Sequence, residues 1–192
     1  MGDDLGAQAS EVHAAASAVL AFWFDETPAD KHFAKDDALD RAIAERFGAL
    51  RDRLLASGAA GWDGDSETML AAIVVLDQFS RNIYRGSGEA FAADGLALDL
   101  THRALAKGWD EALPPERRAF LYLPLMHAED REEQRLSVDC FTRLGLSENL
   151  DFAKAHRVVI DRFGRFPSRN AALGRVSTEA EKAYLSQPGA GW

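Results

Sequence analysis

The chain has 192 residues, 47% of them hydrophobic and 28% charged, which is enough to form one globular domain with a sizeable core. Its net charge of −9 disfavours nucleic acid and anionic membranes as partners, because an acidic surface repels both. No stretch approaches the roughly 18 apolar residues of a membrane span, and the acidic start is unlike a signal peptide, so we expect a cytoplasmic protein.

Apolar residues recur with the period of an α-helix along the whole chain. The pattern predicts helices over residues 11–24, 37–57, 67–84, 89–107, 115–127, 133–144 and 147–165, and from Thr178 to about Leu185. Gly58 is a helix-ending residue, Pro115 suits a first helical turn, and Thr178 with Glu181 has capping-box spacing. No alternating run predicts a strand.

The predicted fold class is therefore all-α, with about eight helices. Short connections between them favour antiparallel helical hairpins. We expect a single domain over residues 1–192, with short flexible ends near 1–10 and 187–192. Residues 69–79 are apolar nearly all round, which predicts a central helix, and Pro124 predicts a kink or break just before His127. Cys140, the single cysteine, is interpreted as a buried apolar residue.

Two segments share a pattern: VLDQFSRN at 75–82 and VIDRFGRFPSRN at 159–170. Each places an aspartate four residues before an arginine, Asp77 before Arg81 and Asp161 before Arg165. Such pairs stabilise a helix by roughly 0.2–0.5 kcal/mol each. This local role does not account for Asp77, which follows four aliphatic residues. A buried carboxylate requires partners, so Asp77 is either the centre of a polar network or a site residue.

The second segment is basic within an acidic protein. Residues 156–175 contain five arginines and one aspartate, a net charge of +4 that leaves −13 for the rest of the chain. Arginine binds carboxylate and phosphate through paired hydrogen bonds, so this turn is suited to an anionic ligand. The alternative, which we weigh slightly higher, is that these arginines pair with acidic residues of the same chain, particularly EDREE at 129–133.

Histidines supply the third candidate group. His127 is followed by Glu129 and Asp130, a set that could bind a metal or support acid–base chemistry, although acids there also suit the start of a helix. His156 lies on an apolar stripe and is more typical of a core histidine. Catalysis becomes credible only if both histidines converge with Asp77. No nucleotide-binding, zinc-protease or serine-hydrolase motif is present, so we expect no cofactor and no metal.

The segments AVLAFWF (18–24), LDQFSRNIYRGSGEAFAAD (76–94), FLYLPLMHAED (120–130), SVDCF (137–141) and HRVVIDRFGRFPSRNAALGRVSTEAE (156–181) resemble, in the same order, the blocks of a bacterial family of unknown function, domain of unknown function 924. The resemblance implies a tetratricopeptide-repeat-like (TPR-like) array of helical hairpins and no particular activity. Ser80 replaces a more usual proline of that family, and Ser168 a more usual histidine.

The resemblance and the residue patterns together give the candidate ligand-binding residues Asp77, Arg81, Asn82, Arg85, His127, Glu129, Asp130, His156, Arg165, Arg169, Asn170 and Arg175. Gln78 is a further characteristic polar position of the family. The favoured hypothesis is a binding or scaffold module whose polar groove takes an acidic peptide or a small anionic metabolite. The alternative is an enzyme acting on a small anionic substrate, with Asp or His as acid or base and arginines as a clamp.

Overall fold

The structure is a computed structural model that describes residues 2–191, with side chains from residue 9 onward, and this part of the chain is all-α with no strand. The α-helices are α1 (Gly2–Leu20), α2 (Asp37–Ser57), α3 (Ser66–Ile73), α4 (Ser80–Ile83), α5 (Asp94–Ala106), α6 (Pro115–His127), α7 (Arg131–Leu144), α8 (Ser147–Phe163) and α9 (Glu179–Leu185). Short π-helical segments, η1 (Ala21–Glu26) and η3 (Val74–Phe79), and 3₁₀ turns, η2 (Ala29–Lys31), η4 (Gly88–Phe91) and η5 (Pro167–Arg169), complete the fold.

The helix boundaries follow the local sequence signals closely. Helices α2 and α6 have the predicted bounds, and α2 ends at Gly58 in the left-handed conformation, with φ of 62°. The capping box of α9 is formed, with Thr178 and Glu181 satisfying each other's backbone amides. Helix α5 begins later than predicted, because residues 88–91 form a separate 3₁₀ turn.

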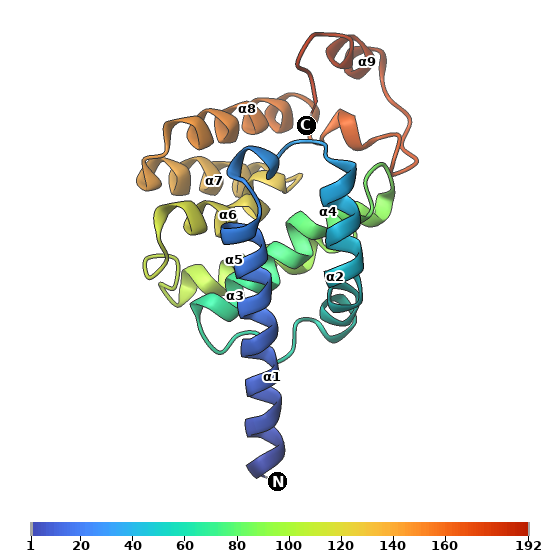
Figure 1. Ribbon diagram of the computed structural model, residues 1–192. Coiled ribbons are helices and arrows are strands. Elements are labelled where there is room, and N and C mark those ends of the chain that lie inside the picture. Colours follow the sequence, from blue (N-terminus) through green and yellow to red (C-terminus); the bar gives the residue numbers. More distant parts are fainter. Residues whose placement is uncertain (1, 192) are drawn as a thin grey trace.

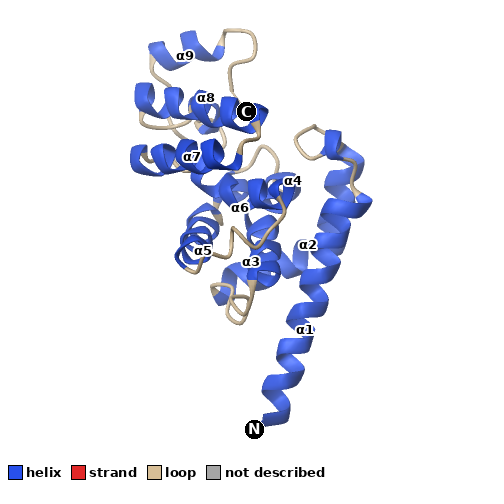
Figure 2. Ribbon diagram, turned by 90° about the vertical axis from the view of Figure 1, so that its left-hand side faces the viewer, coloured by secondary structure: helices blue, strands red, loops and turns tan. Residues whose placement is uncertain are grey.

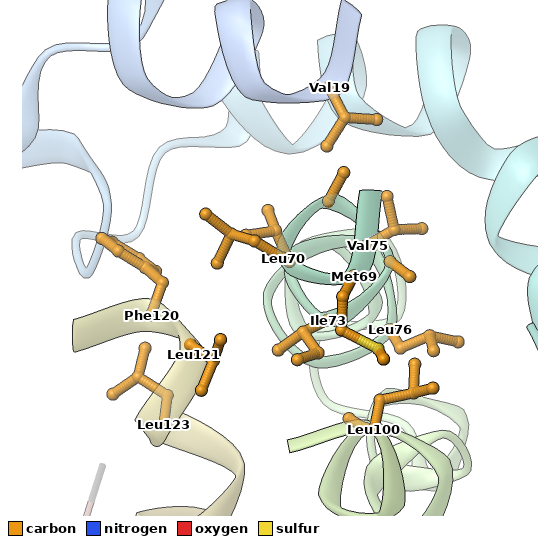
Figure 3. Close-up of a cluster of buried hydrophobic side chains, with 14 of the residues drawn as sticks. Val19, Met69, Leu70, Ile73, Val75, Leu76, Leu100, Phe120, Leu121 and Leu123 are labelled. Atoms are coloured by element: carbon orange, nitrogen blue, oxygen red, sulfur yellow. The ribbon is translucent and has the colours of Figure 1, made fainter. Parts of the chain in front are cut away.

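The segment α3–η3–α4 is the centre of the fold, as its apolar sequence predicted. Met69, Leu70, Ile73 and Leu76 are fully buried. Helices α1, α2, α5 and α6 all pack against this segment. Figure 3 shows Val19 from α1 and Leu100 from α5 on different sides of it, with side chains of α6 beside them. The middle of this segment is π-helical, which the sequence pattern did not indicate.

Consecutive helices in the second half of the chain are neighbours in space. Helices α5 and α6, α6 and α7, and α7 and α8 pack against each other and are joined by short links, an arrangement of antiparallel hairpins. In both ribbon views α7 and α8 lie side by side and α9 lies beyond α8 (Figures 1 and 2). The opposite end of the molecule is marked by α1, whose N-terminal half projects away from the other helices (Figures 1 and 2).

The expected break at Pro124 does not occur. Helix α6 continues through Pro124 and ends at His127. Residues 119–126 are all buried, and the hydroxyl of Thr101 in α5 donates to the carbonyl of Leu121 at 3.0 Å. Packing on all sides and this added hydrogen bond hold the helix together despite the missing amide hydrogen. His127 is therefore fixed at the end of a rigid, buried helix.

Within the described residues, no helix combines the length and apolarity that crossing a membrane requires. Residues 2–10 form the first half of α1. The flexibility expected near residues 1–10 and 187–192 stays a prediction, and residues 1 and 192 lie outside the described part of the chain.

Candidate functional site

The π-helical segment η3 places Asp77 inside the protein, where it is only 1% exposed. One of its carboxylate oxygens accepts a hydrogen bond from His127 Nδ1 at 2.7 Å and lies 3.0 Å from Arg81. The other oxygen accepts from the side-chain amide of Gln78. Burial would raise the pKa of Asp77, but the charge of Arg81 and the hydrogen bonds from His127 and Gln78 outweigh it and hold that pKa below its ordinary value. Asp77 is therefore a buried, ionised and fully paired carboxylate.

The tripeptide Ser-Arg-Asn occurs at residues 80–82 and again at 168–170, and we call these segments the first and the second Arg-Asn turn. The two turns meet at Asp94, the first residue of α5. Arg81 from the first turn binds both oxygens of this carboxylate at 3.0 Å. Arg169 from the second turn donates to one of the same oxygens at 3.2 Å and also to the backbone carbonyl of His127 at 2.9 Å. Near this junction Gly88 approaches the second turn so closely that a Cβ there would lie 3.1 Å from the carbonyl oxygen of Ala172.

Aromatic rings hold the guanidinium group of Arg169. Its central carbon lies 4.7 Å from the ring centre of Phe91 and 4.6 Å from that of Phe166. Burial, with the neighbouring charge of Arg81, lowers the pKa of Arg169 to about 10. The positive charge of Arg169 is therefore less well compensated than that of an ordinary paired arginine.

His127 and His156 are adjacent, with ring centres 6.2 Å apart. His156 donates from Nδ1 to the carbonyl of Phe152 in its own helix at 2.8 Å. Burial, reinforced by the nearby His127, lowers the pKa of His156 to about 3. Burial also lowers the pKa of His127 against the opposing influence of Asp77. Both imidazoles are therefore neutral at neutral pH.

These contacts define a central cluster, consisting of Asp77, Arg81, Asp94, His127, His156 and Arg169. It joins η3, α4, α5, α6, α8 and η5, segments far apart in the sequence. His127 contacts Asp77 directly, and His156 lies beside His127. The cluster is neither a pure arginine pocket nor a pure acidic site, since it contains two carboxylates and two guanidinium groups.

Glu129 and Arg175 lie at the border of the cluster. Arg175 binds Glu129 at 2.8 Å, and Glu129 also accepts the backbone amide of Phe166 at 2.8 Å. Asp130 instead caps α7 by accepting the amides of residues 132 and 133. In the part of the chain that the structure describes, no group of three His, Cys, Asp or Glu side chains is arranged for a metal ion, so His127, Glu129 and Asp130 do not form one.

The remaining candidate residues lie elsewhere. Asn82 and Arg85 both bind Asp40 of α2, and so tie the first turn to that helix. Arg165 binds both carboxylate oxygens of Glu181 in α9. Asn170 donates to the hydroxyl of Ser177 within its own turn. The two asparagines of the Arg-Asn turns therefore do not meet, although the two arginines do.

The Asp77–Arg81 pair forms as predicted, but the second predicted pair, Asp161–Arg165, does not. Helix α8 ends at Phe163 because Gly164 turns left-handed, with φ of 70°. Arg165 therefore lies beyond the helix, where it reaches Glu181, and Asp161 pairs with Arg157 at 3.4 Å. Internal pairing of the basic turn is thus extensive, and Glu129 is the partner that it uses from the predicted acidic run.

Sequence reasoning missed Asp94 and Phe91. Asp94 occupies the first turn of a helix, where an acid is ordinary, and neither residue has a spacing relationship to Arg169.

Two hollows on the described surface are separate from the cluster. One of about 250 Å³ lies among α1, α3 and α6 and includes His13 and Arg117, and one of about 430 Å³ lies along α8 around Phe152.

Comparisons with known proteins agree with the fold. A family model described as a bacterial protein of unknown function (DUF924) matches residues 19–189. The chain is similar to a solved structure of a protein of unknown function from Agrobacterium tumefaciens, with 38% sequence identity and a TM-score of 0.86, over 91% of this chain and 98% of the other. No curated protein matches the chain. Since the family model spans most of its length, the chain belongs to the bacterial DUF924 family.

Proposed function

We propose that the protein is a binding module and that its central cluster binds a small anionic ligand carrying a carboxylate. The observation that supports this most is the sharing of Asp94 by two guanidinium groups, Arg81 and Arg169. Both arginines donate hydrogen bonds to this carboxylate of the protein itself. A carboxylate supplied by a ligand fits the same paired hydrogen-bond geometry.

The arginines have capacity for a further anion. A guanidinium group carries five donors, and Arg169 uses one toward Asp94 and one toward the carbonyl of His127. The side chains of Arg81, Arg169 and Asp94 are 20%, 11% and 21% exposed, so the cluster is reachable from solvent. Burial and the charge of Arg81 destabilise the charged form of Arg169. A second carboxylate beside Arg169 therefore stabilises the protein more than a carboxylate beside an exposed arginine does.

A small anion suits this site better than an acidic peptide. The chain carries a net charge of −9, and an extended acidic partner would face that background along its length. A small dicarboxylate needs contact only with the two arginines.

We further propose that a single TPR-like domain carries this site. Helices α5 to α8 pack as successive hairpins, and one main core includes residues from Ala16 to Ala153, which supports this proposal.

The test is calorimetric titration of the purified protein with succinate, inorganic phosphate and a poly-glutamate peptide. Succinate is expected to bind the wild type, and Arg169→Gln is expected to abolish binding. Arg157→Gln is the matched control, because Arg157 belongs to the same basic segment but is half-exposed and pairs with Asp161 outside the cluster. Succinate binding that survives in Arg169→Gln, or preferential binding of the peptide, would overturn the proposal.

A further inference from the structure

The central cluster contains a histidine whose two ring nitrogens have different surroundings. His127 Nδ1 is hydrogen-bonded to Asp77, whereas no described residue bonds Nε2. The side chain as a whole is 14% exposed. With Nδ1 bonded to Asp77, Nε2 is the ring nitrogen that remains for a ligand.

Asp77 determines which form of the imidazole is present. A carboxylate that accepts from Nδ1 places the ring proton there and leaves the lone pair on Nε2. Gln78 and Arg81 hold the same carboxylate in place, so the orientation of the ring is fixed. If Nε2 takes up a proton, the resulting imidazolium lies directly against a negative charge. This is the arrangement by which a carboxylate supports a histidine base.

Charged and titratable groups from four elements lie around His127. Asp77 lies on η3, Arg81 on α4, His156 on α8 and Arg169 on η5. Burial disfavours the imidazolium form, and the two arginines add to this effect against the opposing charge of Asp77, so the pKa of His127 lies below its ordinary value. At neutral pH Nε2 is therefore unprotonated and available as a base.

We propose that His127 Nε2 is the general base of a hydrolytic site that acts on small esters bearing a free carboxylate, with Arg169 binding that carboxylate. This inference rests on the proposed function, because it uses the same anion-binding arginine. No side chain of the cluster is an ordinary nucleophile, so the nucleophile is water. The arginines also provide positive charge near the oxyanion that forms during attack.

The reaction consists of two proton transfers. His127 Nε2 removes a proton from a water molecule while the water oxygen forms a bond to the ester carbonyl carbon. The tetrahedral intermediate then breaks its bond to the alcohol oxygen, and that oxygen takes the proton from Nε2. The products are a carboxylic acid and an alcohol, and the imidazole is restored. Water is the single co-reactant.

The same Asp77–His127 bond could serve only to fasten η3 to α6, so the experiment must separate catalysis from stability. The probes are mono-p-nitrophenyl succinate, which carries a carboxylate, and the neutral p-nitrophenyl acetate. Hydrolysis is followed for the wild type, His127→Gln and Arg169→Gln. His102→Gln is the control, because His102 binds Glu133 away from the cluster. Succinate binding and circular dichroism are measured on each variant.

The wild type is expected to hydrolyse the anionic ester in preference to the neutral one. His127→Gln should lower kcat by about 10²–10⁴-fold, the usual contribution of general-base catalysis, while succinate binding changes little. Arg169→Gln should raise KM for the anionic ester alone. If the wild type binds succinate but hydrolyses neither ester, or if His127→Gln keeps the wild-type kcat, the catalytic inference is wrong and the binding function stands. If succinate does not bind, both are wrong.

If His127→Gln fails to fold, two measurements on the wild-type protein still test the catalytic role of His127. Its kcat for the anionic ester is expected to be constant above about pH 6.5 and to fall in acid as Nε2 is protonated. Diethyl pyrocarbonate is expected to acylate His127, as located by mass spectrometry, and succinate should protect it. A rate independent of His127 acylation would contradict the inference.

Discussion

Arg81 and Arg169 come from two Arg-Asn turns in distant parts of the sequence, and their guanidinium groups meet on one carboxylate, that of Asp94. Two like charges are held close together by a single shared partner and by the aromatic rings beside them. The arrangement makes Asp94 the internal counterpart of the anion that we propose as ligand.

Added carboxylate should restore part of the stability that the Asp94→Ala variant loses. The change leaves two guanidinium groups without their shared partner, at a cost of about 1–3 kcal/mol in the free energy of unfolding. Acetate should restore a larger part of the melting temperature in this variant than in the wild type. Asp99→Ala in the same helix is the control, since Asp99 is largely exposed. Equal responses to acetate in both variants would show that Asp94 marks no anion site.

Asp77→Asn should be among the most destabilising single changes in the chain. It removes the charge that pairs with the buried guanidinium group of Arg81 and the carboxylate that accepts from His127, and losses of about 3–5 kcal/mol are usual for such a change. The pKa of Asp77 is lowered in the folded state, so its contribution is complete above the unfolded pKa of about 3.9 and declines as the pH falls below it. Urea unfolding at pH 7 and at pH 3 measures both effects.

Asp139→Asn is the matched control for that change, because Asp139 is exposed on α7. Its unfolding midpoint should stay near that of the wild type. A loss in Asp77→Asn no larger than in this control would mean that the buried network does not support the fold.

Acid should destabilise the protein through His156. The folded state holds the pKa of His156 at about 3, below the unfolded value of about 6.5, so the unfolded chain binds the extra proton between these values. Stability therefore falls as the pH is lowered through this range, by up to about 1.4 kcal/mol per pH unit. His156→Leu should reduce that slope in denaturant unfolding series. An unchanged slope in His156→Leu would refute the assignment.

Glu181→Gln should loosen the C-terminal segment alone. Glu181 binds both Arg165 and the start of its own helix, and these contacts hold the pKa of its carboxyl at about 2. Amide hydrogen exchange should accelerate in residues 165–185 and remain slow in α3 and α5, which lie in the main core. Glu179→Gln, an exposed acid of the same helix, should leave the exchange unchanged. Uniform acceleration across the chain would contradict a local role.

Local sequence signals were sufficient for most of the fold. Gly58, Pro115 and the Thr178 capping box act within one helical turn, and the boundaries that they predict for α2, α6 and the start of α9 agree with the structure. The sequence did not predict the π-helical turn around Asp77, because residues 69–79 are apolar nearly all round and their pattern has no period that separates a π-helical turn from an α-helical one. Gly164 ends α8 before Arg165, so Asp161 and Arg165 do not share a helix and the pair that their spacing predicts does not form.

The site was predictable only in part, for a different reason. The burial of Asp77 followed from the aliphatic residues before it, and the location of the site from the two Arg-Asn turns and His127. Asp94, Phe91 and Asp40 are joined to these residues by tertiary packing, and no spacing in the sequence encodes such contacts. The divergence of Asn82 from Asn170 was hidden for the same reason.

The most direct test of anion binding by the cluster is a titration with succinate followed by NMR of the arginine side-chain Nε–H groups and the histidine rings. We expect the signals of Arg169, Arg81 and His127 to shift together and to reach saturation at one common dissociation constant. Signals that shift only at exposed arginines such as Arg157, or that never saturate, would contradict a binding site at the central cluster.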